Sequence, residues 1–125
     1  MKKNETAEHI ENICDFKYLS ETMGGKKKAI REVIDAFIEQ VPQQLKSIND
    51  AIAKTDYSMI KRFAHLMRSS ISIMGIYTLV PILQEMENLG TKATDIEKIK
   101  KLNEQLNSIS NQALEEIERV KPNYI

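Results

Sequence analysis

The sequence predicts an all-α protein, and three observations support this. Glycine and proline are scarce, with four Gly and three Pro in 125 residues, and Trp is absent, which disfavours a turn-rich β fold. Apolar residues recur every three or four positions over long stretches, as on one face of a helix. Capping residues, glycines and prolines separate these stretches. The length fits one domain with a single core.

The first predicted helix is short and lies near the N-terminus. Asp15 is a suitable N-cap residue, because its carboxylate can accept a hydrogen bond from a backbone N–H group of the first turn. Three apolar residues then share one face: Phe16, Leu19 and Met23. The Gly24-Gly25 pair should end the helix, since glycine adopts the left-handed conformation at little cost.

The second predicted helix spans about residues 26–54. Its core stripe is regular and consists of Ile30, Val33, Ile34, Phe37, Val41, Leu45, Ile48 and Ile52. Pro42 lies inside it, where proline removes a backbone donor and crowds the carbonyl four residues earlier. Because the stripe keeps its phase across Pro42, we expect a kink near Ile38 and no break.

The third and fourth helices follow after short connections. The third begins near Asp56, another N-cap candidate, and ends before Gly75. The fourth begins around Thr78, tolerates Pro81 in its first turn and is predicted to stop at Gly90.

The fifth helix opens with Thr94 and Glu97, whose three-residue separation predicts a capping box, and ends at Pro122. Four long helices joined by connections of about 2–6 residues reverse direction at each turn. We therefore predict an antiparallel up-and-down four-helix bundle over residues 15–121, with a short additional N-terminal helix. Residues 1–14 are expected to form a frayed N-terminal segment.

Composition excludes several classes of protein. Eighteen basic residues balance eighteen acidic ones, so no overall field favours nucleic acid or a membrane surface. The longest apolar-rich stretch, residues 71–83, is shorter than the ~20 residues of a membrane span. The N-terminus has no secretory pattern, so a cytoplasmic location is expected.

Metal and disulfide chemistry are also disfavoured. Cys14 is the single cysteine and there are two histidines, so neither a disulfide framework nor a zinc-ligand spacing exists. A di-iron bundle needs Glu-x-x-His pairs, but Arg62 precedes His65 by three residues and Thr6 precedes His9 by three. No metal site is predicted.

His65 is the leading candidate for chemistry. At about 100° per residue, it falls opposite the apolar face of the third helix, and its neighbours on the wheel are polar: Ser58, Lys61, Arg62, Arg68, Ser69 and Ser72. A neutral imidazole nitrogen is a good nucleophile near neutral pH. With cations beside it, the ring is available to a macromolecular partner or to an anion.

The residues around His65 form the string Ala64-His65-Leu66-Met67-Arg68-Ser69-Ser70-Ile71, and Gly75 follows His65 by ten positions. This string resembles the pattern Ala-His-x-Leu-Lys-Gly-Ser-Ser of the histidine-containing phosphotransfer (HPt) family, four-helix bundles that relay phosphoryl groups in multistep signalling. The opening Asp15-Phe16-x-Tyr18-Leu19 and the stretch Phe37-Ile38-Glu39-Gln40-Val41-Pro42 are also similar to the family. The resemblance spans roughly residues 15–119.

Two positions depart from the family pattern. Ser69 stands where the family has glycine, and Ile71 replaces the second serine. Glycine lets a partner's backbone approach the imidazole, so Ser69 narrows that access, although its hydroxyl could also hydrogen-bond the phosphoryl group.

The resemblance implies a phosphoryl carrier without kinase activity of its own. His65 would accept phosphate from the phospho-Asp of a receiver domain and relay it to another, with Arg68, Ser69, Lys61, Arg62 and Ser72 stabilising the phosphoryl group or docking the partner. The receivers would belong to a hybrid histidine kinase or a response regulator and would bring the Mg²⁺, so this chain needs no cofactor. A monomer is expected, because the acceptor face must stay free.

Two alternatives remain open. The chain could be a helical adaptor that docks receivers without being phosphorylated, a reading that Ser69 supports. It could also be the phospho-accepting module of a chemotaxis-type kinase, although no dimerisation or ATP-binding segment accompanies it. For Leu66, Ile76 and Tyr77 two roles are open, the border of a docking surface or packing inside the bundle.

Overall fold

The structure, a computed structural model, describes residues 13–124. Over this range the chain is all-α, as predicted, and contains no strand. The helices are α2 (Phe16–Thr22), α3 (Lys27–Ala53), α4 (Tyr57–Ile73), α5 (Leu79–Lys92) and α6 (Ile96–Val120), followed by the short 3-10 helix η1 (Lys121–Tyr124). The N-terminal segment predicted to fray lies, apart from its last two residues, outside the described range.

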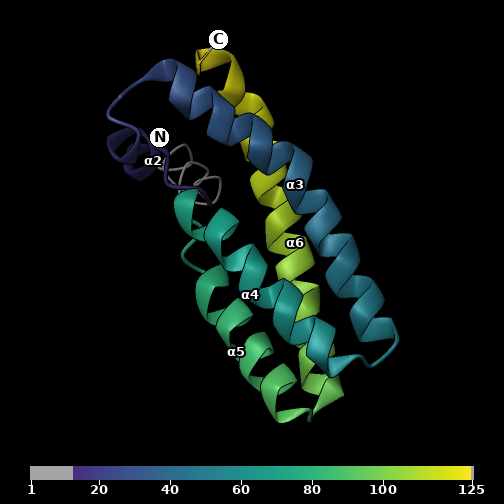
Figure 1. Cartoon of the computed structure of the whole chain (residues 1–125). Coiled ribbons are helices and arrows are strands. Elements are labelled where there is room, and N and C mark those ends of the chain that lie inside the picture. Colours follow the sequence, from purple (N-terminus) through teal and green to yellow (C-terminus); the bar gives the residue numbers. More distant parts are fainter. Residues whose placement is uncertain (1–12, 125) are drawn as a thin grey trace, which may run out of the picture.

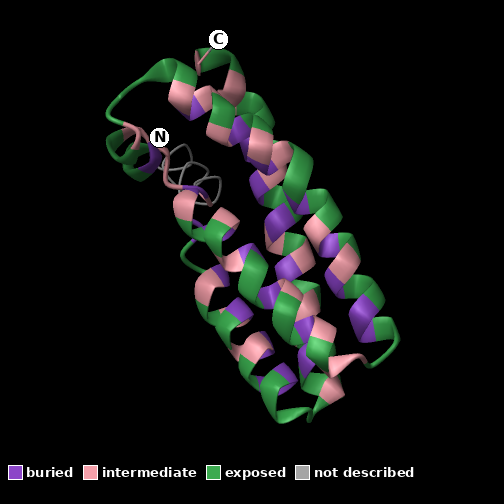
Figure 2. Ribbon diagram, in the orientation of Figure 1, coloured by how far each residue is buried: buried purple, intermediate pink, exposed green. Residues whose placement is uncertain are grey.

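The four long helices lie side by side along one axis, and α2 lies near one end (Figure 1). Helix α3 packs against α4 and α6, and α5 packs against the same two helices. Colour along the ribbon shows that each long helix runs opposite to the one before it. Buried residues recur along each of the long helices, alternating with exposed ones (Figure 2). Helix α4, which carries His65, therefore has neighbours on two sides and one exposed face.

The predicted caps of α2 and α4 are confirmed. The Asp15 carboxylate accepts from Tyr18 N and caps α2, and the Asp56 carboxylate accepts from Met59 N and caps α4. Helix α2 ends where the Gly24-Gly25 pair enters the left-handed region, with φ of 66° and 73°. These signals could be read from sequence because each acts within one helical turn.

The prediction that the fourth helix stops at Gly90 is wrong. Helix α5 continues to Lys92, and the left-handed residue beyond it is Ala93, with φ of 53°. Gly90 is buried inside α5, where a Cβ atom would stand 3.0 Å from Lys61 N on α4. Gly90 therefore allows α4 and α5 to pack closely, whereas the prediction had it end the helix.

The predicted capping box at the start of the fifth helix is also wrong. Asp95, not Thr94, is the N-cap residue of α6, and its carboxylate accepts from Lys98 N. Asp95 adopts a left-handed backbone with φ of 61°, which starts the helix one residue later than predicted. Glu97 then lies in the first turn and pairs with Lys100 at 3.5 Å.

Pro42 lies within an uninterrupted α3, so the prediction that it does not break the helix is confirmed. The kink near Ile38 stays a prediction. Apolar side chains of α3 on both sides of the proline remain buried, including Ile34, Phe37, Val41 and Leu45. Packing against α4 and α6 compensates for the backbone hydrogen bond that proline cannot make.

The chain before α2 is fixed to the connection between α4 and α5. Asp15 N donates to Met74 O at 3.0 Å, and the Tyr77 hydroxyl donates to the Asp15 carboxylate at 2.8 Å. Gly75 has φ of 70°, and a Cβ atom there would stand 2.5 Å from Asp15 Cβ. Only glycine fits this contact. Ile76, the next residue, is fully buried, so of its two predicted roles the structure supports internal packing.

Cys14 is buried, and its backbone N–H donates to the Glu116 carboxylate of α6 at 2.8 Å. Burial, together with the nearby Glu116, raises the pKa of the Cys14 thiol. The side chain is thus an apolar filler with little thiolate character. Among residues 13–124, no helix is long and apolar enough to cross a membrane.

Candidate functional site

His65 lies on the exposed face of α4 because its neighbours along the helix are fixed in the core. Ala64, Met67 and Ile71 are fully buried, and the position after Ala64 is rotated about 100° away from that stripe. The His65 side chain is 63% exposed. The ring is therefore open to a macromolecular partner, as the helical wheel predicted.

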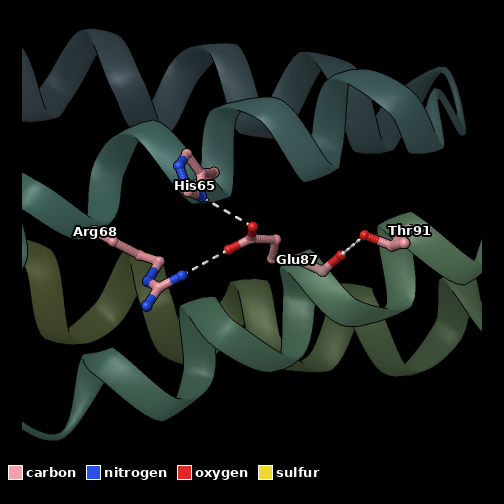
Figure 3. Close-up of polar contacts among 4 residues, drawn as sticks. All are labelled: His65, Arg68, Glu87 and Thr91. Atoms are coloured by element: carbon pink, nitrogen blue, oxygen red, sulfur yellow. Dashed lines mark hydrogen bonds and ion pairs between the residues drawn. The ribbon is translucent and has the colours of Figure 1, made fainter.

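A carboxylate on the neighbouring helix holds the ring. His65 Nδ1 lies 2.9 Å from Glu87 Oε2 on α5, and Arg68 Nη1 donates to Glu87 Oε1 at 3.0 Å. Figure 3 shows the two oxygens of Glu87 divided between these partners. The Glu87 backbone carbonyl also accepts from the Thr91 hydroxyl at 2.9 Å. One acidic side chain thus joins the histidine and the arginine across the α4–α5 contact.

This contact indicates which nitrogen of His65 carries the proton. An ionised carboxylate can only accept hydrogen bonds, so Nδ1 of His65 must carry the proton that Glu87 accepts. In the neutral ring, Nε2 then has the free lone pair. The contact therefore occupies Nδ1 and leaves Nε2 as the ring nitrogen without this partner.

The electrostatics of Glu87 agree with an ionised carboxylate. Partial burial by itself raises its pKa, but hydrogen bonds from Arg68 and then His65 outweigh that effect and hold the pKa of Glu87 below its ordinary value. Glu87 itself is only 20% exposed, whereas its partner His65 is open to water. The carboxylate therefore remains charged, and able to accept from Nδ1, at neutral pH.

The predicted site residues fall into three groups. The first, Lys61 and Arg62, lines an open hollow with His65 and Glu87, to which Ser58 and Leu66 also contribute. Both cations are exposed, and within residues 13–124 neither forms an ion pair. Their charges are available to an anion bound at His65.

Arg68 forms the second group alone. It is one-third exposed, and its guanidinium is turned to Glu87. In this state its charge neutralises the carboxylate and is not directed at the open hollow.

Ser69 and Ser72 form the third group. Both are exposed on α4, but Ser69 lines a separate groove between α3 and α4, with Phe37 and Gln40 across from it. Ser72 lies two turns of helix from His65. The structure therefore brings Lys61 and Arg62 to the histidine and leaves these two serines to its side.

The half-exposed Leu66 continues this surface toward α3. It lines a second groove with Phe63 and Gln40, and it is 52% exposed. Tyr77 is exposed as well, at 59%, but it lies at the end of α4 against Asp15. Leu66 is the apolar candidate that the structure places beside His65.

Reasoning from the sequence did not identify Glu87. A weak signal existed, because Glu87 directly follows the buried Met86 and so lies at the border of the apolar face of α5. Glu85, the other acidic residue of α5, directly precedes Met86 and gives the same signal. The choice among them requires the relative position of α4 and α5.

Comparison with known proteins gives two findings. The family model described as "Hpt domain" matches residues 32–120. The crystal structure of histidine-containing phosphotransfer protein B (HptB) from Pseudomonas aeruginosa PAO1 has a similar fold, with a TM-score of 0.82 and 18% sequence identity, over 91% of this chain and 98% of that chain. No sequence of a curated protein matches significantly.

Proposed function

The chain belongs to the Hpt domain family, and on that premise we propose that His65 accepts a phosphoryl group from the phospho-Asp of one receiver domain and relays it to another. Histidine phosphotransfer is the role of the family. The assignment to His65 is supported by one observation above all, an exposed ring whose Nδ1 is held by Glu87.

The proposed transfer needs no other nucleophile. The Nε2 lone pair attacks phosphorus, the bond between phosphorus and the Asp oxygen of the receiver breaks, and the electron pair stays on the Asp carboxylate. The ring keeps its Nδ1 proton, and the adjacent charge of Glu87 stabilises the positive imidazole. In the second step a carboxylate oxygen of the next receiver's Asp attacks phosphorus, the N–P bond breaks, and its electron pair returns to Nε2. Both steps depend mainly on positioning and charge neutralisation.

We assign the surrounding residues to different tasks. Lys61 and Arg62 offset the charge of the phosphoryl group, because both line the hollow at His65. Arg68 neutralises Glu87 in the resting state and can add a donor after phosphorylation. Ser69 and Ser72 contact the docked receiver. The receiver brings Mg²⁺, which neutralises its own aspartyl phosphate, and this chain supplies no cofactor.

The finer architecture belongs to the same proposal. An antiparallel up-and-down four-helix bundle over residues 15–121, with α2 as an additional helix, would be a rigid support that keeps the His65 face open. A monomer suits this role, since a subunit covering α4 would block the receiver. The protein would act in the cytoplasm as a carrier without kinase activity.

Mixing the purified protein with a phosphorylated receiver and Mg²⁺ tests the proposal. Wild type should gain acid-labile, base-stable phosphate, and His65→Gln should gain none. ATP alone should label neither protein. Binding of receivers by both proteins without any label would instead identify a non-phosphorylated adaptor, the alternative that Ser69 favours. Label that appears only with an ATP-binding kinase domain would identify a chemotaxis-type module.

A further inference from the structure

Gly90 lies where the backbones of α4 and α5 approach each other closely. A Cβ atom at this position would stand 3.0 Å from Tyr57 O, 3.0 Å from Lys61 N and 3.1 Å from Lys61 Cα. All three are backbone atoms of α4, which cannot swing aside as the end of a flexible side chain can. Any side chain at Gly90 must therefore push the two helices apart by a few tenths of an ångström.

The contact between Gly90 and Lys61 and the contact between Glu87 and His65 lie next to each other along the α4–α5 interface. Lys61 lies one turn before His65 on α4, and Glu87 lies one turn before Gly90 on α5. Residues three or four apart share a helix face. The two helices run in opposite directions (Figure 1), so the Gly90–Lys61 contact stands about one turn from the Glu87–His65 hydrogen bond.

The hydrogen bonds across this interface have little tolerance for a wider spacing. The 2.9 Å contact between His65 and Glu87 and the 3.0 Å contact between Arg68 and Glu87 both bridge α4 and α5. His65 and Arg68 on α4 share the Glu87 carboxylate. If the Glu87 side chain moves to keep one of these hydrogen bonds, its distance to the other partner increases. A displacement of a few tenths of an ångström therefore lengthens at least one of these bonds.

We propose that Gly90 is a positioning residue for phosphoryl transfer, because the helix spacing that it permits holds Glu87 against His65 Nδ1. Glycine is unfavourable in the middle of a helix, and the backbone at Gly90 is helical with no positive φ. A residue with a side chain could adopt the same backbone conformation, so conformational freedom does not explain the glycine. The absence of a side chain is what the position requires. This inference rests on the proposed role of His65 as the phosphoryl acceptor.

The test compares Gly90→Ala with Gly24→Ala in the full chain. Gly24 is the control for a glycine-to-alanine change away from this interface, because a Cβ there faces open space, although its left-handed backbone gives the variant a stability cost of its own. The ring nitrogens of His65 are followed by long-range ¹H–¹⁵N NMR, with His65→Gln to assign the signals. Gly90→Ala should shift the ring away from the Nδ1-protonated tautomer and slow phosphoryl acceptance roughly two- to tenfold, the effect of weakening one hydrogen bond. Gly24→Ala should change neither measurement.

Two further variants, Glu87→Asp and Gly90→Ala combined with Glu87→Ala, distinguish a positioning role of Gly90 from a general loss of structure. Glu87→Asp withdraws the carboxylate without touching the helix contact, so it should reproduce the tautomer shift of Gly90→Ala. In a Glu87→Ala background, Gly90→Ala should have no further effect on the ring or the rate.

Three results would overturn the proposal: a wild-type ring pattern in Gly90→Ala, an undiminished effect of Gly90→Ala in the Glu87→Ala background, or a Gly90→Ala chain that loses its helical circular dichroism while Gly24→Ala keeps it. The ring pattern is measured without any partner, so a failure of phosphoryl transfer itself would leave this test intact.

Discussion

Replacing Glu87 with alanine should slow phosphoryl acceptance by His65 about fivefold while the chain stays folded. The variant removes the acceptor of the Nδ1 proton and frees the ring to rotate and to exchange tautomers, so a smaller share of rings presents an unprotonated Nε2. It also releases Arg68 from its 3.0 Å contact.

The magnitude follows from the geometry. A hydrogen bond to a charged group contributes about 1.5–3 kcal/mol when it is shielded from water. The His65 side chain is 63% exposed, so water competes for the ring. We therefore assign this hydrogen bond about 1 kcal/mol. At about 1.4 kcal/mol per factor of ten, this gives the roughly fivefold decrease in rate. The rate of Glu87→Gln should lie between those of wild type and Glu87→Ala, because its amide oxygen can still accept from Nδ1 but carries no charge.

The assay is the initial rate of label transfer from a phosphorylated receiver. Glu85→Ala is the matched control on the same helix, since Glu85 forms a surface ion pair with Lys98 at 3.2 Å and has no contact with His65. Its rate should equal that of wild type. A Glu87→Ala protein that accepts phosphate at the wild-type rate, with the control also unchanged, would refute the role of Glu87 in orienting the ring.

Two further predictions concern stability. The pKa of Glu87 is held below its ordinary value in the folded chain, so its ionised form favours folding. This contribution to the free energy of unfolding is complete above the unfolded pKa of about 4.3. It is lost as the pH falls through the lower pKa of the folded chain. Urea unfolding should therefore show Glu87→Gln less stable than wild type at neutral pH, with the gap closing in acid; a gap that widens in acid would contradict this reasoning. Gly75→Ala should lose at least about 2 kcal/mol of unfolding free energy, since the left-handed backbone by itself costs a residue with Cβ about 1–2 kcal/mol and the new Cβ also meets Asp15. Gly24→Ala has the same left-handed backbone but open space around it, so an equal loss in both variants would show that the Asp15 contact contributes nothing.

Local signals were sufficient for most of the fold. The apolar stripes and the caps at Asp15 and Asp56 act within one or two turns of a helix, so the sequence predicted where α2, α3 and α4 begin and end. The two wrong boundaries, Gly90 and Thr94, have a common cause. Glycine and threonine were assigned their usual local roles, whereas packing against α4 and the left-handed backbone of Asp95 decided those positions.

The sequence by itself determined that the protein is all-α and that His65 stands on the polar face of a helix with cations beside it. Those properties follow from the 3.6-residue period, which needs no knowledge of neighbouring helices. Only the tertiary structure selected Glu87 as the partner of His65, 22 residues away along the chain. It also divided the predicted cations, leaving Lys61 and Arg62 beside the ring and Arg68 on the carboxylate. Contacts between helices depend on their separation and rotation, and these are set by the packing of both helices together, down to the missing side chain of Gly90.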